Sequence, residues 1–129
     1  MGHTLGLGHT NLTRCPNNSA DGDWSKCEAV EYGGAVDVMS NVDVKGPLST
    51  YHQWRMGIMK DSDIAQVWKT QTLTLNSTNS PSGLRALFIR DGSSTYWVEF
   101  RKASDGYTPG LAIYRTDPPP TSSVVTPNI

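Results

Sequence analysis

One short stretch of the chain carries apolar side chains at helical spacing. Tyr51, Trp54 and Ile58 lie three or four positions apart, which is enough for one buried face of a helix. Ser49, just before this stretch, is a residue type that caps helix N-termini well. The pattern therefore predicts a short helix from Thr50 to Met56.

After this helix the period of the pattern changes to two, as is typical of half-buried strands. Threonines that alternate with larger side chains predict a strand over residues 67–75. The Asp-Gly-Ser-Ser sequence at 91–94 is a strong hairpin signal, and it predicts strands at 84–90 and 95–101. A further strand is expected at 111–115. One helix ahead of several strands predicts an α+β fold.

Length and composition limit the possible functions. At 129 residues, of which 36% are hydrophobic, the chain is one domain, or a piece of one, with a modest core. The net charge of -1 gives no electrostatic argument for binding nucleic acid or an anionic membrane, and we expect neither partner. No apolar stretch is long enough to span a bilayer. We expect the protein to be a monomer.

The chain has two cysteines, Cys15 and Cys27, and their spacing fits no C-x-x-C zinc or redox pattern. Between them lies a turn-rich loop, residues 16–24, with little intrinsic order. A disulfide that closes this loop would stabilise the fold by about 3 kcal/mol on the chain-entropy model. We therefore expect a disulfide and an extracellular location, and two unpaired thiols in a cytosolic protein are the alternative.

The first nine residues hold two histidines, His3 and His9, six positions apart with Gly6 midway. Glycine adopts the positive φ at which a helix ends and the chain turns back. With such a turn at Gly6, His9 approaches a metal ion from below the helix that carries His3. A glycine-rich surface tail with two incidental histidines is the alternative that the residues themselves leave open.

The wording of this segment, His-Thr-Leu-Gly-Leu-Gly-His, resembles the second half of the metzincin protease signature, H-E-x-x-H-x-x-G-x-x-H. The resemblance implies that His3 is the second zinc ligand, Gly6 the turn glycine and His9 the third ligand. It also implies that the first histidine and the glutamate stand immediately before Met1, in a longer reading frame. We therefore expect Zn²⁺ as the cofactor.

A second segment adds to the resemblance. Residues 32–40 read Tyr-Gly-Gly-Ala-Val-Asp-Val-Met-Ser, which is similar to the Met-turn of gametolysin-like metzincins. In that family a methionine in a tight turn lies beneath the three histidines, and the resemblance gives this place to Met39. Its soft, unbranched side chain suits the irregular space under a metal site.

The resemblance also implies a division of the chain. Residues 1–60 correspond to the lower, C-terminal subdomain of a metzincin catalytic domain. Residues 61–117 are expected to form a small antiparallel β-rich subdomain, because their strands resemble the segment that follows the catalytic domain in secreted bacterial and algal metalloproteases. Residues 118–129, rich in Pro, Ser and Thr, are expected to be a flexible tail.

The function implied by the resemblance is that of a secreted zinc metalloendopeptidase, which hydrolyses protein or peptide substrates with a zinc-activated water. The general base of that reaction is the glutamate of the signature. Glu28 and Glu31 lack the helical spacing to His3 that this role requires, so the general base is assigned to no residue of this chain. We expect these residues alone to be inactive.

Three other side chains receive structural interpretations. His52, on the predicted helix, is expected to be a partly buried or exposed structural histidine rather than a metal ligand. Glu99 and Arg101 point to the same side of their strand, and we expect a solvated or cross-strand pair.

The alternative function is that of a non-catalytic extracellular β-rich module that binds carbohydrate or protein. In that case the N-terminal histidines are incidental. Exposed aromatic side chains at Tyr96, Trp97 and Tyr107 would be the contacts.

Overall fold

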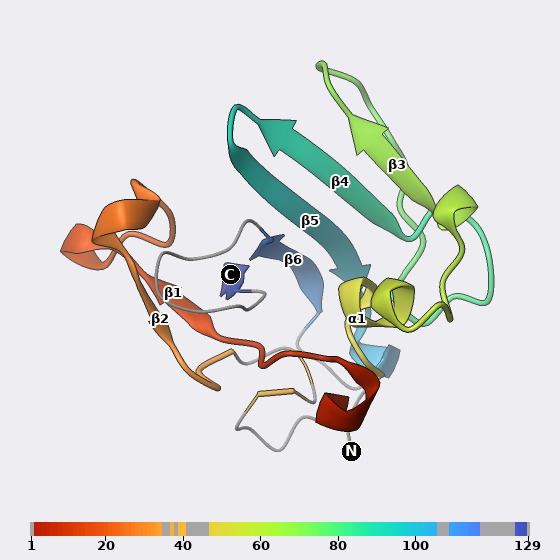
Figure 1. Cartoon of the computed structure of the whole chain (residues 1–129). Helices are drawn as coiled ribbons and strands as arrows, with labels where there is room; N and C mark the ends of the chain where they lie inside the picture. Colours follow the sequence, from red (N-terminus) through yellow and green to blue (C-terminus); the bar gives the residue numbers. More distant parts are fainter. Residues whose placement is uncertain are drawn as a thin grey trace.

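The computed structural model describes residues 2–34, 37, 39–40, 47–105, 109–116 and 126–128. Over these residues the protein has a mixed α/β fold that consists mostly of strands, with one α-helix and two sheets (Figure 1). The strands are β1 (Leu12–Arg14), β2 (Glu28–Val30), β3 (Ile64–Val67), β4 (Ala86–Asp91), β5 (Ser94–Arg101), β6 (Gly110–Arg115) and β7 (Thr126–Asn128). The helices are α1 (Thr50–Arg55) and the short 3-10 helices η1 (Gly2–Leu5), η2 (Pro16–Asn18), η3 (Trp24–Lys26), η4 (Asp61–Asp63) and η5 (Ala103–Asp105). No helix in this described part is long and apolar enough to cross a membrane.

The two sheets differ in size and connectivity. β1 and β2 form a two-stranded antiparallel sheet, and the other strands form a sheet in the order β3-β4-β5-β6-β7. The strands from β4 to β6 pair antiparallel, as predicted, but β3 runs parallel to β4. The wholly antiparallel arrangement expected from the sequence is therefore wrong at β3, because the long connection between Val67 and Ala86 returns the chain to the same end of the sheet.

The predicted hairpin between β4 and β5 is confirmed. Asp91 pairs with Ser94, and Gly92 in the turn takes a φ of 58°. The strand predicted over residues 67–75 is wrong, because β3 ends at Val67 and residues 68–74 are exposed outside any strand. Alternating side-chain types indicate a strand only where one face of that strand is buried. Here neither set of alternating side chains is buried.

The predicted helix is confirmed as α1, which follows Ser49 and ends at Arg55. The buried face predicted for it is wrong, because Trp54 is 37% and Ile58 60% exposed, whereas the buried residues of the helix are Thr50, His52 and Gln53. The Ser49 hydroxyl accepts a hydrogen bond from the His52 amide at 3.3 Å, so it caps the helix. Gly57, beyond the last turn, takes a φ of 74°. Helix and sheet share one core, which consists of Met59, Ala86, Trp97, Ala112 and Tyr114 with Tyr51, Ile64 and Phe88 packed against them. Both predicted subdomains contribute to this core, and the division between them stays a prediction.

Cys15 and Cys27 form the predicted disulfide, with their Cα atoms 4.2 Å apart. The loop that it closes is anchored on the larger sheet. Asp21 in the loop accepts hydrogen bonds from Arg115 of β6 at 2.9 Å and from Tyr96 of β5 at 2.7 Å. A disulfide is in keeping with an oxidising compartment.

Part of the segment expected to be a flexible tail is paired with the sheet. Thr126–Asn128 forms β7 and pairs antiparallel with β6, where Pro127 lies opposite Tyr114. Strand β6 therefore lies between two neighbours, β5 and β7. Residues 117–125 lie outside the described residues.

Candidate functional site

His9 lies just after the turn that the sequence predicts. Helix η1 ends at Leu5, and Gly6 takes a φ of 78°, as expected of a glycine that ends a helix. The His9 side chain is 17% exposed, and its Nδ1 lies 2.8 Å from a carboxylate oxygen of Glu31. The ring stacks on that of Tyr32, with centroids 3.7 Å apart. A carboxylate and an aromatic ring thus set the orientation of this imidazole.

The backbone of Tyr32 is held in an unusual conformation beside His9. Its φ of 58° lies in the left-handed region, which is unfavourable for residues other than glycine. The Tyr32 amide donates a hydrogen bond of 2.9 Å to the side-chain oxygen of Asn11, which is only 1% exposed. Surrounding structure holds such strained backbone in place, and strain of this kind clusters at functional sites. Asn11 therefore fixes the position from which Tyr32 reaches His9.

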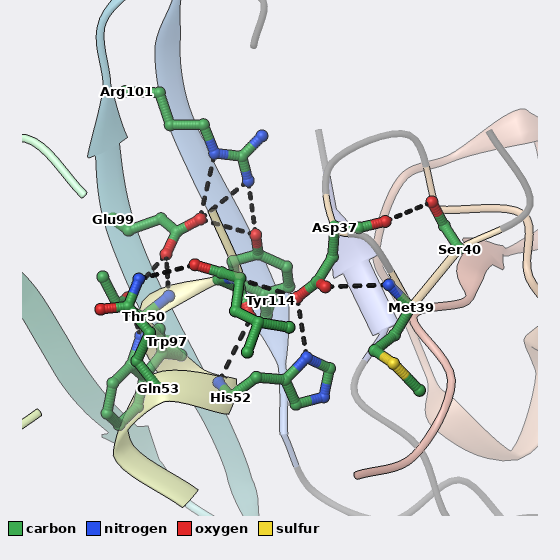
Figure 2. A network of polar contacts seen from close by, with 12 residues as sticks. Asp37, Met39, Ser40, Thr50, His52, Gln53, Trp97, Glu99, Arg101 and Tyr114 are labelled. Atoms are coloured by element: carbon green, nitrogen blue, oxygen red, sulfur yellow. Dashed lines mark hydrogen bonds and ion pairs between the residues drawn. The ribbon is translucent and has the colours of Figure 1, made fainter. Parts of the chain in front are cut away.

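Met39 lies in a tight turn that contacts the chain directly after His9. The Ser40 amide donates to the Asp37 carbonyl at 3.0 Å. The Ser40 hydroxyl donates to the same carbonyl at 2.6 Å, and the Met39 amide donates to the Asp37 carboxylate at 3.0 Å (Figure 2). The Met39 carbonyl accepts a hydrogen bond from the Thr10 amide at 2.9 Å. The turn is thus joined to the residue that follows His9.

The side chain of His3 lies outside the described residues, although its backbone belongs to η1. Convergence of His3 and His9 on one point therefore stays a prediction. Among the side chains that the structure places, no group of three histidine, cysteine, aspartate or glutamate residues is arranged to hold a metal ion.

Asp37 and His52 form a buried pair behind the Met39 turn. One Asp37 oxygen lies 2.7 Å from His52 Nδ1 and accepts the Ser49 amide at 3.1 Å. The two side chains are 0% and 2% exposed. Burial raises the pKa of Asp37, but the hydrogen bond and charge of His52, with the Ser49 and Met39 hydrogen bonds, outweigh it and hold that pKa below its usual range. His52 is thus more buried than expected, and it joins α1 to the turn.

Glu99 is the centre of a second buried network, which lies where α1 meets the larger sheet (Figure 2). One oxygen accepts the amide and the hydroxyl of Thr50 at 2.7 and 2.6 Å. The other accepts two hydrogen bonds from Arg101, at 3.0 and 2.8 Å, and one from the Tyr114 hydroxyl at 2.7 Å. Burial, and then the charge of Glu99, raise the pKa of Tyr114 well above its usual value. With both oxygens occupied, this carboxylate has a structural role.

The expectation of a solvated Glu99–Arg101 pair is therefore wrong, since the two side chains are 0% and 2% exposed. The strand pattern placed both on one side, but it did not show that this side faces the core. Trp97, expected to be exposed, is only 2% exposed, and Tyr96 donates its hydroxyl to the disulfide loop. Tyr107 lies outside the described residues. Of the two expected contacts that the structure describes, Tyr96 and Trp97, neither is an exposed side chain.

Glu31 and Tyr32 were missed as partners of His9. They reach it because β1 and β2 pair antiparallel, with Leu12 opposite Val30, which brings the residues just before β1 beside those just after β2. The strands are three residues long, too short for a clear alternation signal. Nothing in the sequence alone shows this pairing.

A comparison with protein-family models, curated proteins and solved structures finds no match. The functional interpretation therefore depends on the arrangement of the residues themselves.

Proposed function

We propose that residues 1–60 are the lower subdomain of a metzincin catalytic domain, in a secreted zinc metalloendopeptidase that cleaves proteins or peptides. The observation that carries the proposal is the hydrogen bond of 2.9 Å from the Thr10 amide to the Met39 carbonyl. It joins the chain after His9 to the turn that contains Met39, although 29 residues separate them. A Met-turn beneath a histidine ligand requires such a neighbourhood.

The surroundings of His9 fit those of a metal ligand. Histidines that bind metals with one ring nitrogen commonly present the other to a carboxylate, which fixes the tautomer and the ring orientation. Glu31, which lies 2.8 Å from Nδ1, is the carboxylate that would play this part in the proposed site. The helix end at Gly6 is the second supporting feature, because the signature requires the chain to turn between its second and third histidines.

The surroundings of Met39 fit a rigid turn. The Asp37 carboxylate accepts the Met39 amide, and the same side chain is tied to His52 and Ser49 of the α1 region. The turn is therefore fastened on one side to the His9 segment and on the other to α1. A platform held from both sides suits the support of a metal site.

A bound zinc ion would supply Lewis-acid chemistry, by lowering the pKa of a water molecule and polarising the peptide carbonyl. In the proposal, His3 and His9 donate imidazole nitrogens, and Glu31 orients His9. Both glutamates near the site already have partners, Glu31 with His9 itself and Glu28 with Arg14 at 3.4 Å. The proposal therefore requires the signature's first histidine and its glutamate, the general base, in a longer reading frame.

The test begins with the DNA upstream of the Met1 codon. In-frame codons for His-Glu directly before it are expected, and their absence contradicts the proposal. The extended protein should bind close to one zinc ion per chain and cleave casein in a chelator-sensitive manner. The matched variant is His9→Gln, which should lose both zinc and cleavage while keeping its far-UV circular dichroism. Cleavage that survives the chelator or the His9→Gln substitution would point to another mechanism.

A further inference from the structure

A pocket of about 500 Å³ lies beside α1 on the larger sheet, and neither His9 nor Met39 lines it. This volume is in the range of small-molecule sites, roughly 300–1,000 Å³. The pocket is lined by side chains from α1, η4, β3, β4 and β5 and by Thr116, which follows β6. None of these side chains is used by the proposed zinc site.

The floor of the pocket is a row of side chains across three strands. Gln66 of β3 lies opposite Phe88 of β4, and Phe88 lies opposite Trp97 of β5. Residues at such opposed positions point to the same face of a sheet. Trp97 is almost fully buried and Phe88 half-buried, so Phe88 supplies most of the aromatic floor, with the Gln66 amide at one end.

Aromatic side chains of α1 form one wall. Tyr51 meets Trp97 edge to face, with ring centroids 5.3 Å apart, and Trp54 lies 5.6 Å from Trp97. Trp54 is 37% exposed, and its ring nitrogen donates to Asp61 at 2.9 Å. Packing and this hydrogen bond hold the indole in place before any ligand arrives. A fixed aromatic surface loses little conformational entropy on binding.

The rim of the pocket carries polar groups of opposite character. Arg55 supplies a positive charge and Asp61 a negative one, so the rim favours neither an anion nor a cation. At the far end, the hydroxyls of Thr95 and Thr116 lie 2.8 Å apart. With Gln66, these groups offer both donors and acceptors around an apolar floor.

We infer that this pocket binds a neutral saccharide. The hydroxyl groups of a sugar both donate and accept hydrogen bonds, as the mixed rim requires, and its C–H faces pack on aromatic rings such as Trp54. An apolar peptide side chain would contact the aromatic surface but would gain no hydrogen bond from the rim. The inference does not rest on the zinc proposal, because the pocket shares no residue with it. The protein would then hold a glycan or glycoprotein at a site that shares no residue with the proposed zinc site.

The test is isothermal titration calorimetry of the full chain with three neutral probes, cellohexaose, hexa-N-acetylchitohexaose and mannohexaose, and with choline as a cationic probe. At least one neutral hexasaccharide is expected to bind at one site per chain and to change the tryptophan fluorescence. Trp54→Ala should weaken this binding roughly tenfold or more. The matched control is Trp68→Ala, since Trp68 is 70% exposed and does not line the pocket.

A second variant, Gln66→Ala, tests the inference even if Trp54→Ala does not fold. Gln66 is exposed and lies outside the core, so its replacement should not disturb the fold. It is expected to weaken saccharide binding several-fold with unchanged circular dichroism. The inference is overturned by any of three results: none of the three hexasaccharides binds, choline alone binds, or Trp68→Ala weakens binding as much as Trp54→Ala. Each of these results leaves the zinc proposal untouched.

Discussion

The backbone amide and the hydroxyl of Thr50 both donate hydrogen bonds to the same carboxylate oxygen of Glu99. Thr50 is the first residue of α1 and Glu99 lies in the middle of β5, so one buried carboxylate ties the start of the helix to the sheet. The Thr50 hydroxyl also accepts a hydrogen bond from Trp97 Nε1 at 2.7 Å. The position of α1, and with it the wall of the saccharide pocket, therefore depends on this contact.

Replacing Glu99 by glutamine should destabilise the protein strongly. The substitution leaves the Arg101 guanidinium buried without its counter-charge, and breaking a buried pair costs about 3–5 kcal/mol. Urea unfolding followed by tryptophan fluorescence measures the change. The control is Glu28→Gln, which breaks an exposed pair with Arg14 and should change the free energy of unfolding by less than about 1 kcal/mol. Equal stabilities of the two variants would contradict the structural role of Glu99.

Removal of the disulfide should lower stability without undocking its loop. A double Cys15→Ser, Cys27→Ser variant is expected to lose about 3 kcal/mol, mainly because the unfolded chain gains freedom. The hydrogen bonds from Arg115 and Tyr96 to Asp21 remain in the folded state. Urea unfolding with and without a reducing agent measures the loss, and the reduced native protein should match the variant. An unfolding midpoint that does not move in either case would contradict this expectation.

Stability should fall in acid partly because of Asp37. Its pKa is lower in the folded protein than the ordinary 3.8, so the carboxylate contributes stability that is present above about pH 4. That contribution is lost as the pH falls through the lower, folded-state pKa. Asp37→Asn should therefore be less stable than the native protein at pH 7, with a gap that narrows below about pH 4. The hydrogen bond from Arg85 also lowers the pKa of Asp63. The Asp37→Asn variant is therefore still expected to lose some stability in acid.

The measurement is urea unfolding at a series of pH values from 7 to 3. A gap in the free energy of unfolding between the native protein and Asp37→Asn that stays constant across this range would mean that Asp37 has the same pKa in the folded and unfolded states. The pKa of Asp37 would then not be lowered in the folded protein, which would contradict this prediction.

Local patterns in the sequence predicted those features that depend on neighbouring residues. The cap at Ser49, the turn at Gly6 and the hairpin around Gly92 each follow from the backbone preferences of one or two residue types. The same reasoning failed for residues 67–75, because alternation carries no information about what covers the strand.

Features that depend on distant residues were not predictable in this way. Asp37 meets His52 only because the Met39 turn and α1 fold together, and Thr50 meets Glu99 across 49 positions. The burial of Glu99 is a case in point: period two shows which side chains share a face, but not which face is covered. The parallel pairing of β3 with β4 depends likewise on the path of a long connection.

Glu31 should control zinc affinity in the proposed site. Carboxylates that hold the second nitrogen of a ligating histidine typically contribute 10- to 100-fold in metal affinity. In the extended protein, Glu31→Gln is therefore expected to weaken zinc binding by about this factor, because an amide keeps the shape but not the charge that orients His9. Competition with a chromophoric chelator measures the affinity. Glu28→Gln is the matched control, as Glu28 lies three residues away and pairs with Arg14 instead. Equal zinc affinity in the two variants would show that Glu31 has no role in the site. An extended protein that binds no zinc would contradict the zinc site as a whole.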